Sequence, residues 1–482
     1  MRFQAQLKLK SLNSMYFYAP ELPYQYQGHK NLINLVSILN YKFRYILVIF
    51  SLITLQGISQ GEFNNWYFGY YPPLGAGLTF NSVPPTPLNN TMLSSATVTT
   101  NVSDSLGNFL FYSDGMLVFN RTLSLMPNGC CLDGNNLSPF SQPVIAIPKM
   151  DDDSSFYIIT VGSYIPFGTT FGLEYSIVNM RLDGGFGNID ITSKNIPVPN
   201  AQNAWKAISG VRHANNQDIW IITTLSDVNS LHFASYLINK NGINFTPVIS
   251  PSIGNGHYPS PLTQYMYPPN SIKLSMDGSK LVALFGDKIE YCSFNSLTGE
   301  VTHRFFINTG YLIVNGSAEF SIDSKYLYIY SHLQNNSGVI QQFNATLTDS
   351  IQFALSKELI DSGNIKSSLQ MAPDWKIYGS ESMKDSLCVI NFPSEFGAGC
   401  NYQRNAIGLN GYCSDGLPQF IQRYKAYIHS TGQCQGNPIR FSGDIWPPAD
   451  SIRWNFGDPG SGTSNFSVNP APSHIYSSPG VY

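Results

Sequence analysis

The sequence has few charged residues and almost no charge imbalance. Charged side chains make up 12 % of the 482 residues, about half of the ~25 % found in average soluble domains. The formal net charge is −3 and no long run of Lys or Arg occurs, which argues against a nucleic-acid partner. Apolar residues make up 43 %, a fraction too high for a disordered chain. We therefore expect a folded protein that does not bind nucleic acid.

The sequence also lacks the short motifs of common catalytic and metal sites. It contains no H-E-x-x-H pair, no P-loop and no G-x-S-x-G elbow, the signatures of zinc proteases, nucleotide-binding proteins and serine hydrolases. No two of its eight His residues stand at metal-ligand spacing, and its seven Cys residues include no C-x-x-C pair. The sequence therefore predicts no catalytic residue, no metal site and no cofactor.

Long apolar runs are absent, but one short apolar segment is typical of a secretory signal. Residues 45–55 read YILVIFSLITL, follow Lys42 and Arg44, and precede small and polar residues. This pattern is that of a signal peptide, and the run is shorter than the ~20 residues that span a bilayer. We predict a signal peptide over 41–60, a secreted product and no permanent transmembrane anchor. Residues 1–40 are then either a non-native leader upstream of the true start or a genuine cytoplasmic extension.

The cysteines leave the disulfide pattern open. Export would allow disulfides to form, but an odd number leaves at least one cysteine without an intrachain partner. Cys400 and Cys413 flank a short loop and are the first candidate pair. No partner can be assigned to the adjacent Cys130 and Cys131. The alternative is that several of the seven are buried free thiols.

Aromatic residues and turn formers are abundant. The sequence holds 29 Tyr, 30 Phe and 6 Trp with 40 Gly and 30 Pro, a composition that favours many short strands. One unit recurs along the chain: a short strand, a turn built on Asp or Asn, an alternating strand and further strands. Six such turns, 46 to 64 residues apart, lie at Asp104, Asp152, Asn216, Asp277, Asp323 and Asp374. Asp and Asn suit these turns because their side chains accept hydrogen bonds from the backbone two residues on.

Repeated small sheets with this spacing predict a β-propeller. Four-stranded units that recur every ~40 to 50 residues are typical of propeller blades. Residues 66–69 and 76–81 resemble the later strands of a seventh unit, whose first strand 416–424 could supply from the far end. Such a closure leaves no open sheet edge. We predict an all-β fold with a β-propeller over 61–424, of seven blades rather than six or eight. A pair of β-sandwiches is the alternative.

The C-terminal residues carry a different pattern. WNFGD at 454–458 is followed by PSHIYSSPGVY at 472–482. This pattern resembles the PKD family, whose fold is a small immunoglobulin-like β-sandwich. The matching residues are Trp454, Phe456, Gly457, Asp458, His474, Tyr476, Pro479, Gly480 and Tyr482. Asn455 stands where the family usually has Asp, and His474 is expected to be a structural hydrogen-bonding residue. Since the family's strands after P-G-x-Y are absent, we predict a partial PKD domain over 430–482.

An ordered series of short segments carries a second resemblance. NNWYFG, AGLTFN, DSLGNFLFYSDG, LQMAPDWKIY and GLPQFIQ follow one another along the chain. The series resembles the N-terminal propeller of large surface proteins of Bacteroidetes. Those proteins carry PKD repeats and end in a gliding-motility-type sorting domain used in type IX secretion.

This resemblance implies a secreted, cell-surface binding or adhesion platform with a PKD spacer. Its partner would be an unknown protein or glycan. A polysaccharide-degrading propeller enzyme with an accessory PKD module is one alternative, and a structural matrix or stalk component is another. A Pro- and Tyr-rich loop with His257, Tyr258, Tyr265 and Tyr267 could stack on sugar rings or simply connect two blades.

Overall fold

A computed structural model describes most of the chain, in two compact units. The units are Gln60–Tyr424, and Met1–Ser59 together with Lys425–Tyr482. The described residues are 4–8, 14–15, 61–69, 75–92, 95, 97–134, 141–162, 172–226, 230–253, 269–285, 288–308, 313–333, 337–363, 368–421, 425–432, 435–446 and 451–480. No helix among these residues is long and apolar enough to cross a membrane.

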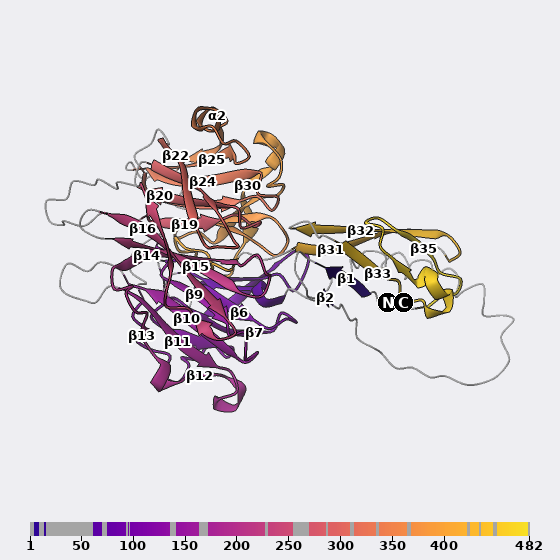
Figure 1. Cartoon of the computed structure of the whole chain (residues 1–482), viewed down its shortest axis with the longest axis horizontal. Helices are drawn as coiled ribbons and strands as arrows, with labels where there is room; N and C mark the ends of the chain where they lie inside the picture. Colours follow the sequence, from indigo (N-terminus) through magenta and orange to yellow (C-terminus); the bar gives the residue numbers. More distant parts are fainter. Residues whose placement is uncertain are drawn as a thin grey trace. The chain divides into compact units, whose positions relative to one another are not determined.

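The larger unit consists of antiparallel sheets that follow one another along the chain (Figure 1). Between residues 61 and 421, the described residues form seven such sheets. The first three hold β3 Asn65–Phe68, β4 Gly75–Thr79 and β5 Thr86–Thr91; β6 Thr100–Ser103, β7 Phe109–Ser113 and β8 Val118–Asn120; and β9 Val144–Pro148, β10 Ser155–Val161, β11 Leu173–Asn179, β12 Asn188–Ile189 and β13 Ile196–Pro197. The fourth holds β14 Ala204–Arg212, β15 Ile219–Ser226, β16 Leu231–Asn239, β17 Gly242–Ile243 and β18 Val248–Ser252.

The remaining three sheets have four strands each. They hold β19 Ser271–Leu274, β20 Lys280–Phe285, β21 Lys288–Phe294 and β22 Val301–Asn308; β23 Ile313–Phe320, β24 Tyr326–Leu333, β25 Gly338–Asn344 and β26 Glu358–Gly363; and β27 Leu369–Met371, β28 Ile377–Ser380, β29 Ser386–Ile390 and β30 Tyr402–Gly408. The helices are short: η1 Gly61–Phe63, η2 Asp183–Gly185, η3 Ile191–Ser193, α2 Ser350–Leu355, η4 Gly397–Cys400 and, in the smaller unit, η5 Pro459–Asn465.

The seven sheets are the blades of a propeller. The first strands of successive sheets contact one another in the order β3, β6, β9, β14, β19, β23 and β27, so these strands surround a common axis. Middle strands are apolar on both faces because each blade packs between two others. On β20, Leu281 and Ala283 lie in one apolar cluster and Val282 and Leu284 in the next. The predicted all-β propeller is thus confirmed, and it has seven blades.

The predicted Asp and Asn turns join the first and second strands of six blades. Asp104 Oδ1 accepts hydrogen bonds from the backbone N–H groups of Leu106 and Asn108, both at 2.9 Å. In the fourth blade the neighbouring Asn215 takes this role, while Asn216 adopts a φ of 61°. These turns share one face of the ring, because strand direction alternates within every blade.

The ring does not close as the sequence suggested. Residues 416–424 were predicted to form the first strand of the first blade, but β3 begins that sheet and no strand is assigned in the described residues 409–421. Pro418 has no N–H group for a ladder, which weakens this segment as a strand. Closure instead depends on an apolar cluster shared by the first and seventh blades, in which Trp66 packs edge-on against Tyr378 at 5.9 Å.

The smaller unit consists of two small sheets over one apolar cluster. One sheet holds β31 Lys425–Thr431, β32 Pro438–Trp446 and β35 Ser473–Ile475, and the other holds β2 Ser14–Met15, β1 Gln4–Lys8, β33 Ser451–Asn455 and β34 Phe466–Ser467. The buried cluster comprises Ile439, Phe441, Trp454, Phe456 and Tyr476. Although the sequence analysis sets residues 1–40 apart from the fold, β1 pairs antiparallel with β33.

Candidate functional site

Polar side chains of the inner strands fill the axis of the propeller. Lys273 on β19 forms an ion pair with Glu319 on β23, with 2.7 Å between Nζ and Oε2. The Lys273 ammonium also donates to Gln370 on β27 at 3.3 Å. The Glu319 carboxylate accepts hydrogen bonds from the backbone N–H groups of Phe320 and Met371. The buried charges thus compensate each other, and their hydrogen bonds join three successive blades.

Little space remains at the axis. The cavity there has a volume of about 20 Å³, which is room for one or two water molecules. Gln419 helps to close it, because its backbone N–H donates to Thr99 at 2.8 Å and its side chain donates to the carbonyl of Val144. Among the described residues, the axis therefore offers no room for an organic ligand.

A larger groove lies between the second and third blades. Its volume is about 370 Å³, within the ~300–1,000 Å³ range of small-ligand sites. Four segments line it: η1, the inner part of the second blade from β6 to β7, strands β9 and β10 with their turn, and the irregular segment 419–421. Both ends of the ring contribute to these walls, so the groove forms only when the propeller closes.

Aromatic rings form the apolar part of the groove. Phe63, Phe156 and Phe420 line it. The rings of Phe63 and Phe420 contact each other with centroids 4.5 Å apart, and Phe156 packs edge-on against Phe111 at 5.4 Å. Because these contacts fix the rings in advance, a ligand that stacks on them orders few additional side chains.

The charged residues of the groove are mostly acidic. Glu62, Asp104 and Asp153 line it together with Lys149. Asp104 is engaged in its own turn, where it accepts hydrogen bonds from two backbone N–H groups. Lys149 Nζ lies 3.6 Å from Asp151 Oδ1. The exposed Asp153 side chain has no hydrogen bond or ion pair within the described residues. Its carboxylate is therefore available to a ligand.

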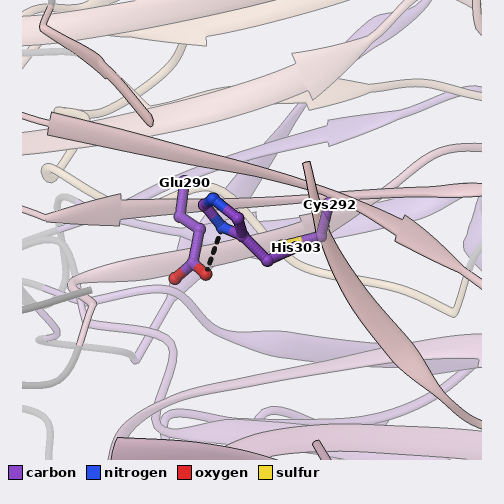
Figure 2. Close-up of side chains that lie close together, drawn as sticks. All are labelled: Glu290, Cys292 and His303. Carbon is purple, nitrogen blue, oxygen red and sulfur yellow. Dashed lines mark hydrogen bonds and ion pairs between the residues drawn. The ribbon is translucent and has the colours of Figure 1, made fainter. Parts of the chain in front are cut away.

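A second polar cluster lies on the fifth blade. Figure 2 shows Glu290 and Cys292 of β21 together with His303 of β22. Glu290 Oε1 lies 3.0 Å from His303 Nδ1, and Glu290 Oε2 accepts a hydrogen bond from the hydroxyl of Ser252 at 2.6 Å. Burial, reinforced by the Glu290 carboxylate, raises the pKa of the Cys292 thiol well above its ordinary value. The thiol is therefore neutral at pH 7.

A carboxyl pair joins the second and third blades. Burial of Glu174 on β11, followed by the charge and hydrogen bonding of Asp133, raises the pKa of Glu174 to about 7. Asp133 closely follows Cys130 and Cys131, which form a disulfide with each other. The sequence left the partners of these two cysteines unassigned.

The predicted disulfide between Cys400 and Cys413 is absent. Both are buried free thiols, and burial raises the pKa of each above its ordinary value. Cys400 packs in the apolar cluster shared by the sixth and seventh blades, whereas Cys413 packs in the cluster shared by the seventh and first blades. Proximity in sequence was misleading because β30 lies between them and the two thiols face different clusters.

Most residues of the PKD-like pattern gather in the core of the smaller unit. Trp454, Phe456 and Tyr476 belong to its apolar cluster. The buried His474 ring stacks on Phe456 with centroids 4.5 Å apart, and its Nε2 lies 3.0 Å from Asp458 Oδ2. The Tyr476 hydroxyl donates to the carbonyl of Phe456 at 2.9 Å. These contacts give His474 the hydrogen bond that the sequence analysis expected.

The turn after β33 contains the one departure from the family pattern. Asn455 Oδ1 accepts a hydrogen bond from the N–H of Gly457 at 3.0 Å, and Gly457 has a φ of 69°. The Asn side chain therefore closes this turn. Pro479 and Gly480 are exposed, and Tyr482 lies outside the described residues.

Other predictions also fall outside the described residues. They are the signal peptide at 41–60 and the Pro- and Tyr-rich loop with His257, Tyr258, Tyr265 and Tyr267. Neither the groove nor the cluster on the fifth blade was predicted from the sequence. The available signal for the cluster was Glu290, an acidic residue inside the otherwise largely apolar segment IEYCSF.

Comparisons with known proteins identify no family for the chain. No protein-family model and no curated protein matches the chain. Among solved structures, a periplasmic gluconolactonase from Pseudomonas aeruginosa is similar at 10 % identity and a TM-score of 0.43, with 74 % of this chain and 98 % of that chain covered. TolB from Acinetobacter baumannii is similar at 8 % identity and a TM-score of 0.33, covering 74 % and 66 %. Hydrazine synthase from Kuenenia stuttgartiensis is similar at 12 % identity and a TM-score of 0.36, covering 78 % and 95 %.

Proposed function

We propose that the chain is a secreted, cell-surface binding protein whose propeller holds a glycan in the groove between the second and third blades. One observation carries the proposal: the groove combines fixed aromatic rings with the uncommitted carboxylate of Asp153. Export is inferred from the segment 41–60. The C-terminal unit acts as a PKD-type spacer, an assignment supported by the sequence pattern at 454–482 and its resemblance to Bacteroidetes surface proteins.

The chemistry of the groove favours a sugar. The C–H face of a sugar ring packs against aromatic rings such as Phe63 and Phe420. A carboxylate offers only acceptor atoms, so Asp153 can accept hydrogen bonds from sugar hydroxyls. Because the groove has three carboxylates and one ammonium, it disfavours uronic acids and sulfated sugars through charge repulsion. The expected ligand is a short neutral or amino-sugar oligomer.

Binding fits the groove better than hydrolysis does. Glycoside hydrolysis uses two carboxyl groups, one as the acid and the other as base or nucleophile. In the groove, Asp104 is already held by the backbone N–H groups of its own turn. Asp153 then remains as an uncommitted acceptor among the described lining residues, which suits recognition without bond cleavage.

A glycan array of the purified full chain tests this proposal, with released reducing sugar measured on every hit. We expect binding to neutral or amino-sugar glycans without sugar release. Asp153→Asn should weaken binding by about tenfold, since a hydrogen bond to a charged group contributes about 1.5 kcal/mol or more. Phe63→Leu, which keeps an apolar side chain but removes the ring, should weaken it as well.

A matched control separates the groove from the rest of the surface. Asp385 is an exposed Asp in the loop between β28 and β29 of the seventh blade, and Asp385→Asn should leave glycan binding unchanged. Sugar release would favour the polysaccharide-degrading alternative. The absence of any glycan binding would overturn the proposal and favour a protein ligand or a structural role.

A further inference from the structure

We propose that Glu290, Cys292 and His303 form a binding site for a zinc-type divalent cation on the fifth blade. The site is separate from the groove between the second and third blades and does not depend on the proposed glycan function. It was not predicted from the sequence, because its ligands come from two strands and show no motif spacing.

Strand geometry brings the three side chains together. Glu290 and Cys292 are two residues apart on β21, so both point to the same face of the sheet. The antiparallel register sets Cys292 opposite His303 of β22, next to a register shift that leaves Arg304 without a direct partner. One ligand atom from each side chain lies within 4.8 Å of the other two, and Figure 2 shows the three groups converging.

The distances suit a small tetrahedral ion. Zinc binds sulfur at about 2.3 Å and nitrogen or oxygen at about 2.0–2.2 Å, so its tetrahedral ligand atoms lie roughly 3.3–3.8 Å apart. Small rotations of side chains that already converge within 4.8 Å would reach this arrangement. Three protein ligands leave a fourth position for water or another small ligand.

The donor set selects the class of metal. A thiolate and an imidazole favour zinc and its neighbours among the transition metals, whereas calcium and magnesium prefer oxygen ligands alone. Binding would form bonds from the metal to Cys292 Sγ, to a Glu290 oxygen and to His303 Nδ1. The thiol proton would leave to solvent, and the ring proton of the neutral imidazole would reside on Nε2.

Surrounding hydrogen bonds orient the carboxylate. The hydroxyl of Ser252 donates to Glu290 Oε2 at 2.6 Å, and the backbone N–H of Ile253 donates to Oε1 at 3.2 Å. Outer contacts of this kind fix metal ligands and commonly affect affinity by ~10–100-fold. Glu290 and Cys292 are buried, but the His303 side chain is 20 % exposed, so a cation can reach the cluster on the imidazole side.

Cobalt titration of the full chain tests the proposal. Co²⁺ takes zinc-type sites and gives an intense thiolate-to-metal absorption band when a Cys binds it. We expect this band to saturate at one equivalent in the wild type, to disappear on addition of excess Zn²⁺, and to be lost in Cys292→Ser. His303→Gln alters a partly exposed side chain and should weaken Co²⁺ binding at least tenfold, in keeping with the size of ligand-shell effects.

Cys388 provides a matched control. It lies on β29, which is the third strand of its blade as β21 is of the fifth, and it is likewise a free thiol. Cys388→Ser should retain the band at full intensity. No band in the wild type, or a band that persists in Cys292→Ser, would overturn the proposal. A circular dichroism melt of each variant shows whether Cys292→Ser still folds. If it does not, the His303→Gln titration decides the test, and unchanged Co²⁺ binding in that variant would overturn the proposal.

Discussion

The two units of the chain bury their apolar side chains in different ways. In the propeller, each blade contributes to clusters with both of its neighbours, as on β20, where Leu281 and Val282 belong to different clusters. The smaller unit has one cluster of five buried residues within the described part of the chain. Small domains bury a smaller fraction of their surface and are correspondingly less stable. Single substitutions should therefore affect the smaller unit more severely.

Polar groups also differ between the units. At the propeller axis, the Lys273–Glu319 pair joins blades that already share large apolar clusters. In the smaller unit, His474 is itself part of the core, stacked on Phe456 and bonded to Asp458. The propeller thus distributes its stability over seven blades, whereas the smaller unit depends on a few residues of its sequence motif.

The largest expected effect is the loss of the smaller unit in Trp454→Ala. Truncation of a buried Trp costs about 3–5 kcal/mol, and Trp454 also donates its indole N–H to Asn469 at 2.9 Å. We expect calorimetry of the full chain to lose the transition of the smaller unit and to keep that of the propeller. Trp220→Ala is the control, because Trp220 is buried in the propeller and should lower only the propeller transition. A shift of both transitions in Trp454→Ala would contradict the independence of the units.

The next effect tests the axis of the propeller. Glu319→Gln leaves the buried Lys273 ammonium without a countercharge, which should cost about 3–5 kcal/mol of propeller stability in urea unfolding. The double variant Lys273→Met with Glu319→Leu removes both charges and should recover most of this loss. If Glu319→Gln has no measurable cost, the ion pair does not help to hold the inner strands.

Much of this fold could be predicted from local chemistry, since Asp and Asn turns mark the first hairpin of six blades. Ring closure could not, because 416–421 contributes side chains such as Phe420 to other blades without joining a sheet. The Cys400–Cys413 prediction failed for a similar reason: which apolar cluster a thiol enters depends on how blades pack.

The groove is lined by segments from both ends of the ring, and the Glu290 cluster depends on a register shift between two strands. Neither leaves a sequence motif.

A smaller effect concerns pH and the contact between the second and third blades. Burial and Asp133 raise the pKa of Glu174 from 4.5 to about 7, so the folded state holds a proton that the unfolded chain releases between these values. The contribution of Glu174 to stability is full below pH 4.5 and is lost as the pH rises through 7. Because the side chain is partly exposed, solvent screening limits the effect to about 1 kcal/mol. Glu174→Gln should raise the urea midpoint at pH 8 and reduce the difference between the midpoints at pH 5 and pH 8. An unchanged difference would count against the carboxyl pair.

The smallest effect is expected from the disulfide between Cys130 and Cys131. A disulfide stabilises mainly by restricting the unfolded chain, and the restriction grows with the length of the loop that it closes. Adjacent cysteines close almost no loop, so reduction should cost about 1 kcal/mol of propeller stability or less. Urea unfolding with and without reductant measures this cost, with Cys130→Ser/Cys131→Ser as the variant that reductant should no longer affect. A loss of several kcal/mol on reduction would contradict this expectation. It would indicate that the disulfide positions the carbonyl of Cys130, which accepts a hydrogen bond from the Lys194 ammonium at 2.6 Å. The blades would then depend on local crosslinks as strongly as the smaller unit depends on its motif.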